Sequence, residues 1–236
     1  MSLSHGKVFE DVPQPEVFVF TDENLAEAKK HIAKYPKGRQ QSAVMPLLAI
    51  AQRQNANWIP KVAMDYIAEM LDMPPIRVYE VATFYTMYNL KPVGKYHVQV
   101  CTTTPCWLRG SDDVVSACKS HLGIGFGETT KDGQFTLSEV ECLGACVNAP
   151  MVQVNDLFYE DLTAESTKEL LKTFAAGAEP KHGPQNSRVS SEPEGGAKTL
   201  LMSANKPKAE KPAKAKSAAT TTGKVAKDTA EENAPG

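Results

Sequence analysis

Four of the five cysteines in this chain form two pairs that are close in the sequence. If all four bind one metal centre, the fold must bring the two pairs together. Cys101 and Cys106 have the spacing C-x4-C, and after a gap of 35 residues Cys142 and Cys146 follow with the spacing C-x3-C. The residues between the partners are small and nearly uncharged, which lets backbone N–H groups point at sulfur. Four thiolates in two pairs are typical of a metal centre, so we predict these four cysteines as its ligands.

Three other roles compete with an iron–sulfur cluster for these cysteines. Structural zinc sites usually pair their ligands as C-x2-C, although the C-x3-C pair alone would fit zinc. A thiol oxidoreductase would need the C-x-x-C motif, which the sequence lacks. Structural disulfides suit small secreted chains, and the N-terminal residues show neither an apolar export signal nor an arginine-rich import pattern. The spacing therefore favours an iron–sulfur cluster, with a zinc-stabilised structural module as the main alternative.

The composition narrows the class of protein further. The 236 residues are 42% apolar and 23% charged, which is typical of a globular protein with one or two small domains. A net charge of −2 gives no sign of nucleic-acid binding, and no apolar run of 18 residues or more predicts a membrane span. An odd number of cysteines is most simply explained by a reducing, cytosolic setting.

Hydrophobic periodicity divides the chain into four parts and predicts an α+β fold. Residues 1–20 are expected to be an irregular lead-in. Residues 21–91 are expected to form a bundle of three or four helices, because apolar residues recur there at helical spacing. Residues 92–178 are expected to form a small α/β domain, and residues 179–236 a tail rich in lysine, alanine and proline.

The pattern within residues 92–178 indicates where the cysteines lie. Tyr96, Val98 and Val100 alternate with polar residues, as in a strand that ends at Cys101. A helix, a hairpin with its turn at Asp132-Gly133, further strands and a final helix follow. The first cysteine pair is therefore expected in the loop that leaves a strand.

The tail after residue 179 differs sharply from the rest of the chain. Residues 180–236 contain no aromatic side chain and carry a net charge of +4, so residues 1–179 carry −6. Such a segment cannot bury enough apolar surface to fold alone, and we expect it to be disordered and solvated. The alternative is an electrostatic tether to an acidic partner or a lipid surface.

Four single residues near the cysteines also carry predictions. Cys118 is expected to be a buried core thiol on a helix and no ligand. Trp107, directly after a ligand, is expected either to shield the metal centre from water or to pack as an ordinary side chain. Gly144 is expected to let the backbone approach sulfur closely, and Pro150 is a candidate for a cis peptide bond.

Several long strings of the sequence resemble one family. The 24-kDa-type [2Fe–2S] subunits of respiratory complex I, the NADH:quinone oxidoreductase, have similar strings in the same order, and the resemblance covers about residues 20–175. The strings are YPKGRQQSAVMPLL at 35–48, VYEVATFY at 78–85, PVGK at 92–95, VCTTTPC at 100–106, ECLGAC at 141–146 and NAP at 148–150. The cysteine frame of the family is intact.

The resemblance implies a thioredoxin-like second domain with one [2Fe–2S] cluster on Cys101, Cys106, Cys142 and Cys146. It implies an electron-transfer subunit of a respiratory oxidoreductase, in a peripheral arm on the cytoplasmic face of the bacterial inner membrane. Its partners would be the subunit that binds flavin and NADH and the neighbouring subunits of that arm. Similar subunits also serve NAD-linked formate dehydrogenases and hydrogenases, which remain alternatives.

The sequence itself gives no sign of a nucleotide site. The segment GIGFG at 123–127 lacks the third glycine of the dinucleotide fingerprint, and no phosphate-loop motif is present. We therefore expect no dinucleotide site and no catalytic residue on this chain. The resemblance implies that FMN and NADH are bound by a partner subunit, and this chain would carry one electron at a time.

Overall fold

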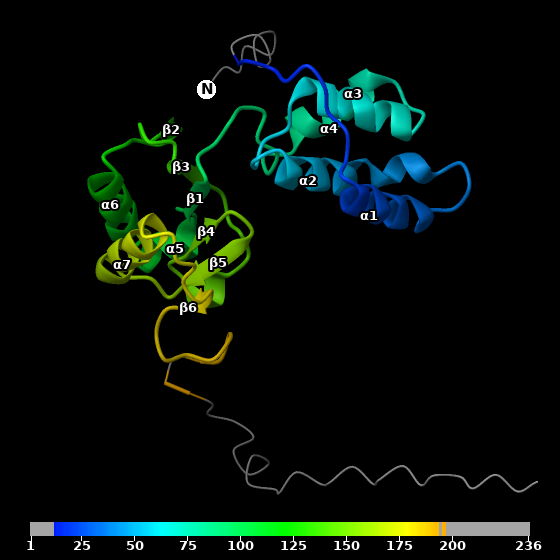
Figure 1. The fold of residues 1–236 in the computed structure, drawn as a ribbon. Coiled ribbons are helices and arrows are strands. Elements are labelled where there is room, and N and C mark those ends of the chain that lie inside the picture. The colour runs from blue at the N-terminus through cyan, green and yellow to red at the C-terminus, as the bar shows by residue number, and fades with distance from the viewer. Residues whose placement is uncertain (1–11, 194, 197–236) are drawn as a thin grey trace, which may run out of the picture. The chain divides into compact units, whose positions relative to one another are not determined.

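The computed structural model describes residues 12–193 and 195–196, and its elements fall into a helical group followed by a group built on a sheet (Figure 1). The predicted α+β fold class is confirmed. The helical group consists of α1 (Asp22–Ala33), the 3-10 helix η1 (Gln40–Ala43), α2 (Val44–Gln54), α3 (Lys61–Met70) and α4 (Pro75–Phe84).

Local sequence explains where these helices begin. The Thr21 side chain caps α1 by accepting a hydrogen bond of 3.3 Å from the backbone N–H of Asn24. Pro75 is the first residue of α4, where its missing N–H costs no hydrogen bond. The turn η1 precedes α2, so α2 begins at Val44 and the Ser42 side chain does not cap it.

The helical group has its own hydrophobic core. Leu47, Met64 and Ile67 are completely buried in it. Phe18 and Phe20, in the irregular segment before α1, join this core and contact the Tyr66 ring edge-on, with centroids 5.9 and 5.5 Å away. Two buried aromatic side chains thus anchor the lead-in, although this segment forms no helix or strand.

The second group is a six-stranded sheet with the order β2-β3-β1-β4-β5-β6. Its central strand β1 pairs in parallel with β3 and antiparallel with β4. Its strands are β1 (Tyr96–Cys101), β2 (Glu128–Thr129), β3 (Phe135–Val140), β4 (Val152–Val154), β5 (Leu157–Glu160) and β6 (Gly183–Pro184). The predicted hairpin is present, since β2 and β3 pair antiparallel around Gly133, which has φ +68°.

Two helices, α6 (Ser111–Leu122) and α7 (Ala164–Ala175), pack against each other and against the sheet (Figure 1). Because side chains alternate along a strand, Val98 and Val100 of β1 point into this core. His97 and Gln99 lie on the opposite face, which is polar. Cys118 of α6 is completely buried in the core, as predicted for a structural thiol.

The chain adds one more strand to the sheet beyond residue 179. Gly183 and Pro184 form β6, which pairs in parallel with β5. The sequence pattern assigns these residues to the tail, because they carry no apolar periodicity. Backbone hydrogen bonds to the exposed edge of β5 hold them instead. Residues 197–236, the rest of the predicted tail, lie outside the described residues.

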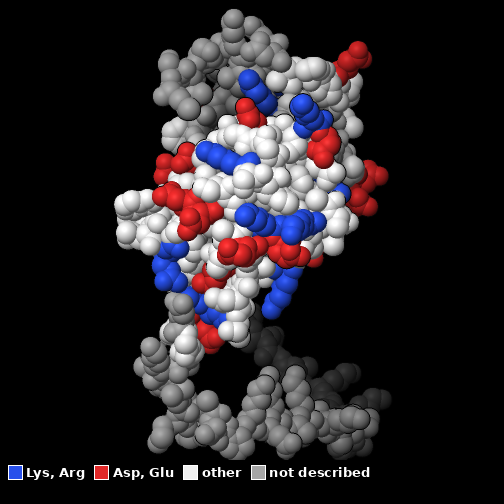
Figure 2. Space-filling view, turned by 90° about the vertical axis from the view of Figure 1, so that its left-hand side faces the viewer, with Lys and Arg blue, Asp and Glu red and all other residues white. Residues whose placement is uncertain are grey.

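Two further properties concern the surface. In the described part of the chain, every helix is too short or too polar to cross a lipid bilayer. Figure 2 shows acidic and basic side chains intermingled on the face that it displays. Mixed charge of this kind is typical of a solvated surface rather than of a nucleic-acid site.

Candidate metal centre

The sheet register brings the two cysteine pairs to one edge. Cys101 is the last residue of β1 and lies opposite Val140, the last residue of β3. Because β1 and β3 are parallel, the loops that leave their carboxyl ends emerge side by side. Cys106 lies on the short helix α5 (Thr104–Leu108) after β1, and Cys142 follows β3. Cys146 begins the 3-10 turn η2 (Cys146–Asn148) in the same second loop.

The two pairs differ in their exposure to solvent. Cys101 and Cys106 are each 1% exposed and pack with Ala149 and Met151 beneath the loops. Cys142 and Cys146 are exposed, and their sulfur atoms lie 3.3 Å apart. All five cysteines of the chain are free thiols. A group held by the four sulfurs would therefore have one buried side and one side open to a partner.

The electrostatics tie the four sulfurs into one site. Burial, and then the neighbouring Cys101 sulfur, raise the pKa of the Cys106 thiol to about 12. The backbone N–H of Gly144 donates to the Cys142 sulfur and lowers its pKa, whereas the Cys142 sulfur raises the pKa of Cys146. Charge on Cys101 and Cys146 is felt across the pairs. A bound cation favours the thiolate form of its cysteine ligands.

The donor set fits a binuclear iron–sulfur cluster. Two pairs of thiolates suit a [2Fe–2S] cluster, in which each iron takes two cysteine ligands. A structural zinc ion would need all four sulfurs around one centre. The spacing within the two pairs favours the cluster, and zinc stays the alternative.

Two threonine–glutamate hydrogen bonds join the first cysteine loop to β3 and to the second cysteine loop. Thr102 Oγ1 donates to Glu139 Oε1 at 2.7 Å, and Thr103 Oγ1 donates to Glu141 Oε2 at 3.4 Å. Sequence reasoning missed these residues, because a polar side chain does not reveal its distant partner. The only available signal was the position of the two threonines directly after Cys101.

The backbone predictions near the cysteines can be compared with the structure directly. Gly144 has φ +88°, a conformation that side chains disfavour, and its N–H reaches sulfur. The Ala149–Pro150 bond is cis, as predicted. The Trp107 side chain is 57% exposed, so within this chain it does not cover the site. Leu108 and Val147, which lie within two residues of ligands in the sequence, are also exposed.

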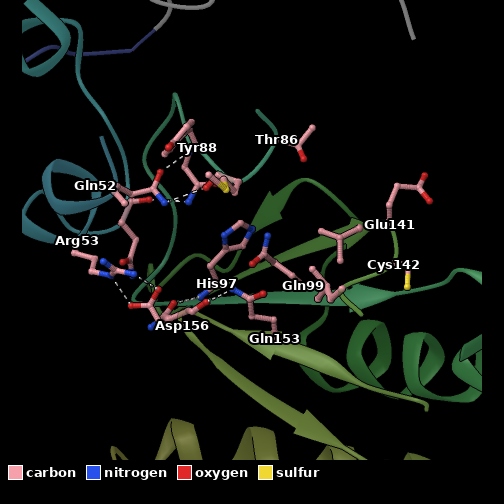
Figure 3. A pocket seen from close by; sticks show the side chains of 17 residues that line it. Gln52, Arg53, Thr86, Tyr88, His97, Gln99, Glu141, Cys142, Gln153 and Asp156 are labelled. Carbon is pink, nitrogen blue, oxygen red and sulfur yellow. Dashed lines mark hydrogen bonds and ion pairs between the residues drawn. The ribbon is translucent and has the colours of Figure 1, made fainter. Parts of the chain in front are cut away.

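A cavity of about 320 Å³ lies beside Cys142, and its lining includes the polar face of the sheet and residues of α2 (Figure 3). Arg53 and Asp156 form an ion pair in its wall, with Nε and Oδ2 2.9 Å apart and both side chains more than half exposed. His97 Nε2 lies 2.8 Å from Ser138 Oγ. Burial lowers the pKa of His97 to about 4, so its ring is neutral at pH 7.

Comparison with known proteins yields one matching family and several close relatives. The family described as thioredoxin-like [2Fe–2S] ferredoxin matches residues 28–175. A subunit of the NADH-quinone oxidoreductase of Rickettsia felis is 59% identical over 158 residues, which cover 67% of this chain and 95% of the relative. The mitochondrial NADH dehydrogenase [ubiquinone] flavoprotein 2 of Dictyostelium discoideum is 54% identical over 200 residues, 85% of this chain and 81% of the relative.

Solved structures resemble the chain more distantly. An NAD⁺-reducing [NiFe]-hydrogenase in the air-oxidized state aligns with a TM-score of 0.49 and 19% identity, over 55% of this chain and 23% of the hydrogenase chain. A likeness of this size does not bear on which assembly contains the chain.

Proposed function

The chain belongs to the thioredoxin-like [2Fe–2S] ferredoxin family, and from this premise we propose that it is the [2Fe–2S] electron-transfer subunit of an NADH:quinone oxidoreductase. The observation that supports the proposal is that both cysteine pairs lie at or after the carboxyl ends of the parallel strands β1 and β3. Relatives of 59% and 54% identity that are named as subunits of this enzyme support the choice of assembly over a formate dehydrogenase or hydrogenase.

In this proposal Cys101, Cys106, Cys142 and Cys146 are the cluster ligands. The bound cluster supplies one-electron storage and transfer. Cys101 and Cys106 hold the buried side, where Met151 and Ala149 exclude water. The Gly144 N–H donates to the Cys142 sulfur, and such hydrogen bonds stabilise the thiolate and tune the reduction potential.

The exposed cysteines, Cys142 and Cys146, indicate which face of the domain we propose as the contact with a partner subunit. Cys142 and Cys146 are open to solvent, and the exposed apolar side chains of Trp107, Leu108 and Val147 lie within two residues of ligands in the sequence. We take these side chains as part of a surface that a partner covers. We infer that the partner is the flavin- and NADH-binding subunit, so that electrons pass through this face. The corresponding location is the peripheral arm at the cytoplasmic face of the inner membrane.

The first experiment is anaerobic purification of the full chain, with visible absorption, reduced-state EPR and counts of iron and sulfide. We expect about two irons and two sulfides per chain and a rhombic EPR signal. Single Cys→Ser changes at Cys101 or Cys142 should abolish this signal. The matched control is Cys118→Ser, which removes a buried thiol outside the site and should leave the signal intact. A colourless wild-type protein with one zinc would refute the electron-transfer role.

A second experiment identifies the assembly. A tagged chain is isolated from cells under mild conditions, and its co-purifying subunits are sequenced. We expect the flavin subunit and the remaining subunits of the quinone-reducing enzyme. Recovery with a formate dehydrogenase or hydrogenase large subunit would keep the cluster and overturn the proposed assembly.

A further inference from the structure

We propose that residues 183–190 form a strap that fixes the loop of Cys146, with Arg188 as the positioning residue for that ligand. The inference rests on the proposed function, since it takes Cys146 as a ligand. It concerns a segment that lies after residue 175, where the match to the family ends. The strap begins with β6, continues with a hydrogen bond of 2.9 Å from Gln185 N to Glu160 O, and ends beside the cysteine loop.

The centre of the strap is a buried ion pair. Arg188 Nε lies 3.2 Å from Asp161 Oδ2, and the two side chains are only 6% and 4% exposed. By comparison, the side chains of the Arg53–Asp156 pair are 58% and 61% exposed. A buried charge is tolerated only where partners satisfy it, so Arg188 and Asp161 hold each other in one arrangement. A surface pair has no such constraint.

Arg188 connects this ion pair to the cysteine loop. Its Nη1 donates a hydrogen bond of 2.9 Å to the backbone carbonyl of Val147, the residue after Cys146. The planar guanidinium can therefore lie against the Asp161 carboxylate as an ion pair while its Nη1 donates to Val147. This hydrogen bond restrains the peptide unit that follows Val147, and so limits the movement of the turn that begins at Cys146.

Asn148 makes the second connection between the loop and the strap. Its amide Nδ2 donates to Asp161 Oδ2 at 3.1 Å and to the Ser190 carbonyl at 2.9 Å, and the side chain is buried. Asp161 N in turn donates to the Asn148 carbonyl at 2.7 Å. Asp161 and Ser190 have φ +53° and +54°, unusual conformations that persist only where surrounding contacts fix them. The strap and the loop thus form one hydrogen-bonded unit.

This unit explains how an exposed ligand is kept in place. Cys146 has no strand or long helix around it, since it begins the three-residue turn η2. Groups behind metal ligands commonly fix the ligand orientation, and their loss typically costs roughly 10- to 100-fold in metal affinity. Arg188 is the group in that position here, although it is distant from Cys146 in the sequence.

The test compares Arg188→Lys and Arg188→Met in the full chain, purified anaerobically with its cluster. Lysine keeps the charge beside Asp161 but lacks the fork that reaches Val147. We expect iron release to a chelator to be roughly ten-fold faster in Arg188→Lys and faster still in Arg188→Met. The g-values and the midpoint potential should shift in both variants, and hydrogen exchange should increase at residues 146–148.

The matched control is Arg77→Met, which removes an exposed pair with Glu80 far along the chain from the cysteines. This variant should match the wild type in every readout. Lower thermal stability of the Arg188 variants with unchanged iron release, g-values and potential would overturn the proposal, because the strap would then be only structural. A wild-type chain without a cluster would instead refute the proposed function.

Discussion

Replacement of Gly144 should make the chain lose its cluster faster, because any other residue is strained in the backbone conformation of this position. Gly144 has φ +88°, and a Cβ atom added there would meet nothing within 4 Å. The cost of Gly144→Ala is therefore conformational strain alone, because no side-chain clash contributes. An L-residue in a left-handed conformation costs about 1–2 kcal/mol, and asparagine is tolerated better than alanine or a β-branched residue.

This strain acts on the equilibrium between the closed and open cysteine loop. A strain of about 1–2 kcal/mol raises the open fraction by about 5- to 30-fold. If a chelator removes iron from the open form, the rate of iron release should rise by the same factor. We expect the half-life of the cluster to fall in the order wild type, Gly144→Asn, Gly144→Ala, Gly144→Val. The assay is the decay of visible absorption of the anaerobic full chain after a chelator is added.

Gly133→Ala is the matched control for this prediction. Gly133 also has a positive φ, +68°, and open space around its Cα, but it lies in the hairpin between β2 and β3. Both variants should lower the thermal midpoint by a few degrees, since about 1 kcal/mol corresponds to about 2–4 °C in a chain of this size. Only Gly144→Ala should release iron faster. Equal iron release in the two variants would refute the link between Gly144 and the cluster.

Three further predictions concern the α/β domain. Cys118→Ala should leave the EPR signal unchanged and lower stability by about 1 kcal/mol, as differential scanning calorimetry can show, because the thiol is buried and burial raises its pKa to about 12. Gly94→Ala should cost about 1–3 kcal/mol in the same measurement, because its Cβ would lie 2.8 Å from the Phe135 carbonyl carbon. Gly125→Ala is its control, since that Cβ meets only a flexible side chain at 3.3 Å; an equal cost in both would contradict the argument. Burial lowers the pKa of His97 from 6.5 to about 4. Between pH 6.5 and pH 4, His97 is therefore mostly protonated in the unfolded chain and mostly neutral in the folded chain. Stability should therefore decline from pH 6.5 to pH 4 by about 3 kcal/mol through this group, and His97→Gln should flatten that part of the profile in pH-dependent thermal unfolding.

The sequence was sufficient to predict the parts of the site that depend on local order. Cys101 follows an alternating strand, so its place at the end of β1 could be predicted from periodicity. The close approach at Gly144 and the cis bond at Pro150 could be predicted from residue type and position. Cys118 could be excluded as a ligand because it lies on the apolar side of a helix.

The contacts that fix the loops could not be predicted, because they depend on pairing between distant segments. Arg188 lies in a stretch with the composition of a solvated tail, and nothing local indicates that its guanidinium is buried against Asp161. The same holds for Thr102 and Glu139, which meet only because β1 and β3 are parallel and in register. Polar side chains specify such contacts through geometry that only the fold supplies.

The unequal exposure of the two cysteine pairs bears on whether the cluster serves the fold or electron transfer. A cluster that only stabilised the domain would gain from burial of all four sulfurs, because exposed thiolates are open to oxidation and exchange. Here Cys142 and Cys146 are exposed, while the Gly144 N–H and the Arg188 contact to Val147 hold their loop from behind. Under the proposed function, a loop that is held from behind and yet open to solvent would give a partner access to the cluster, which favours electron exchange over a purely structural role.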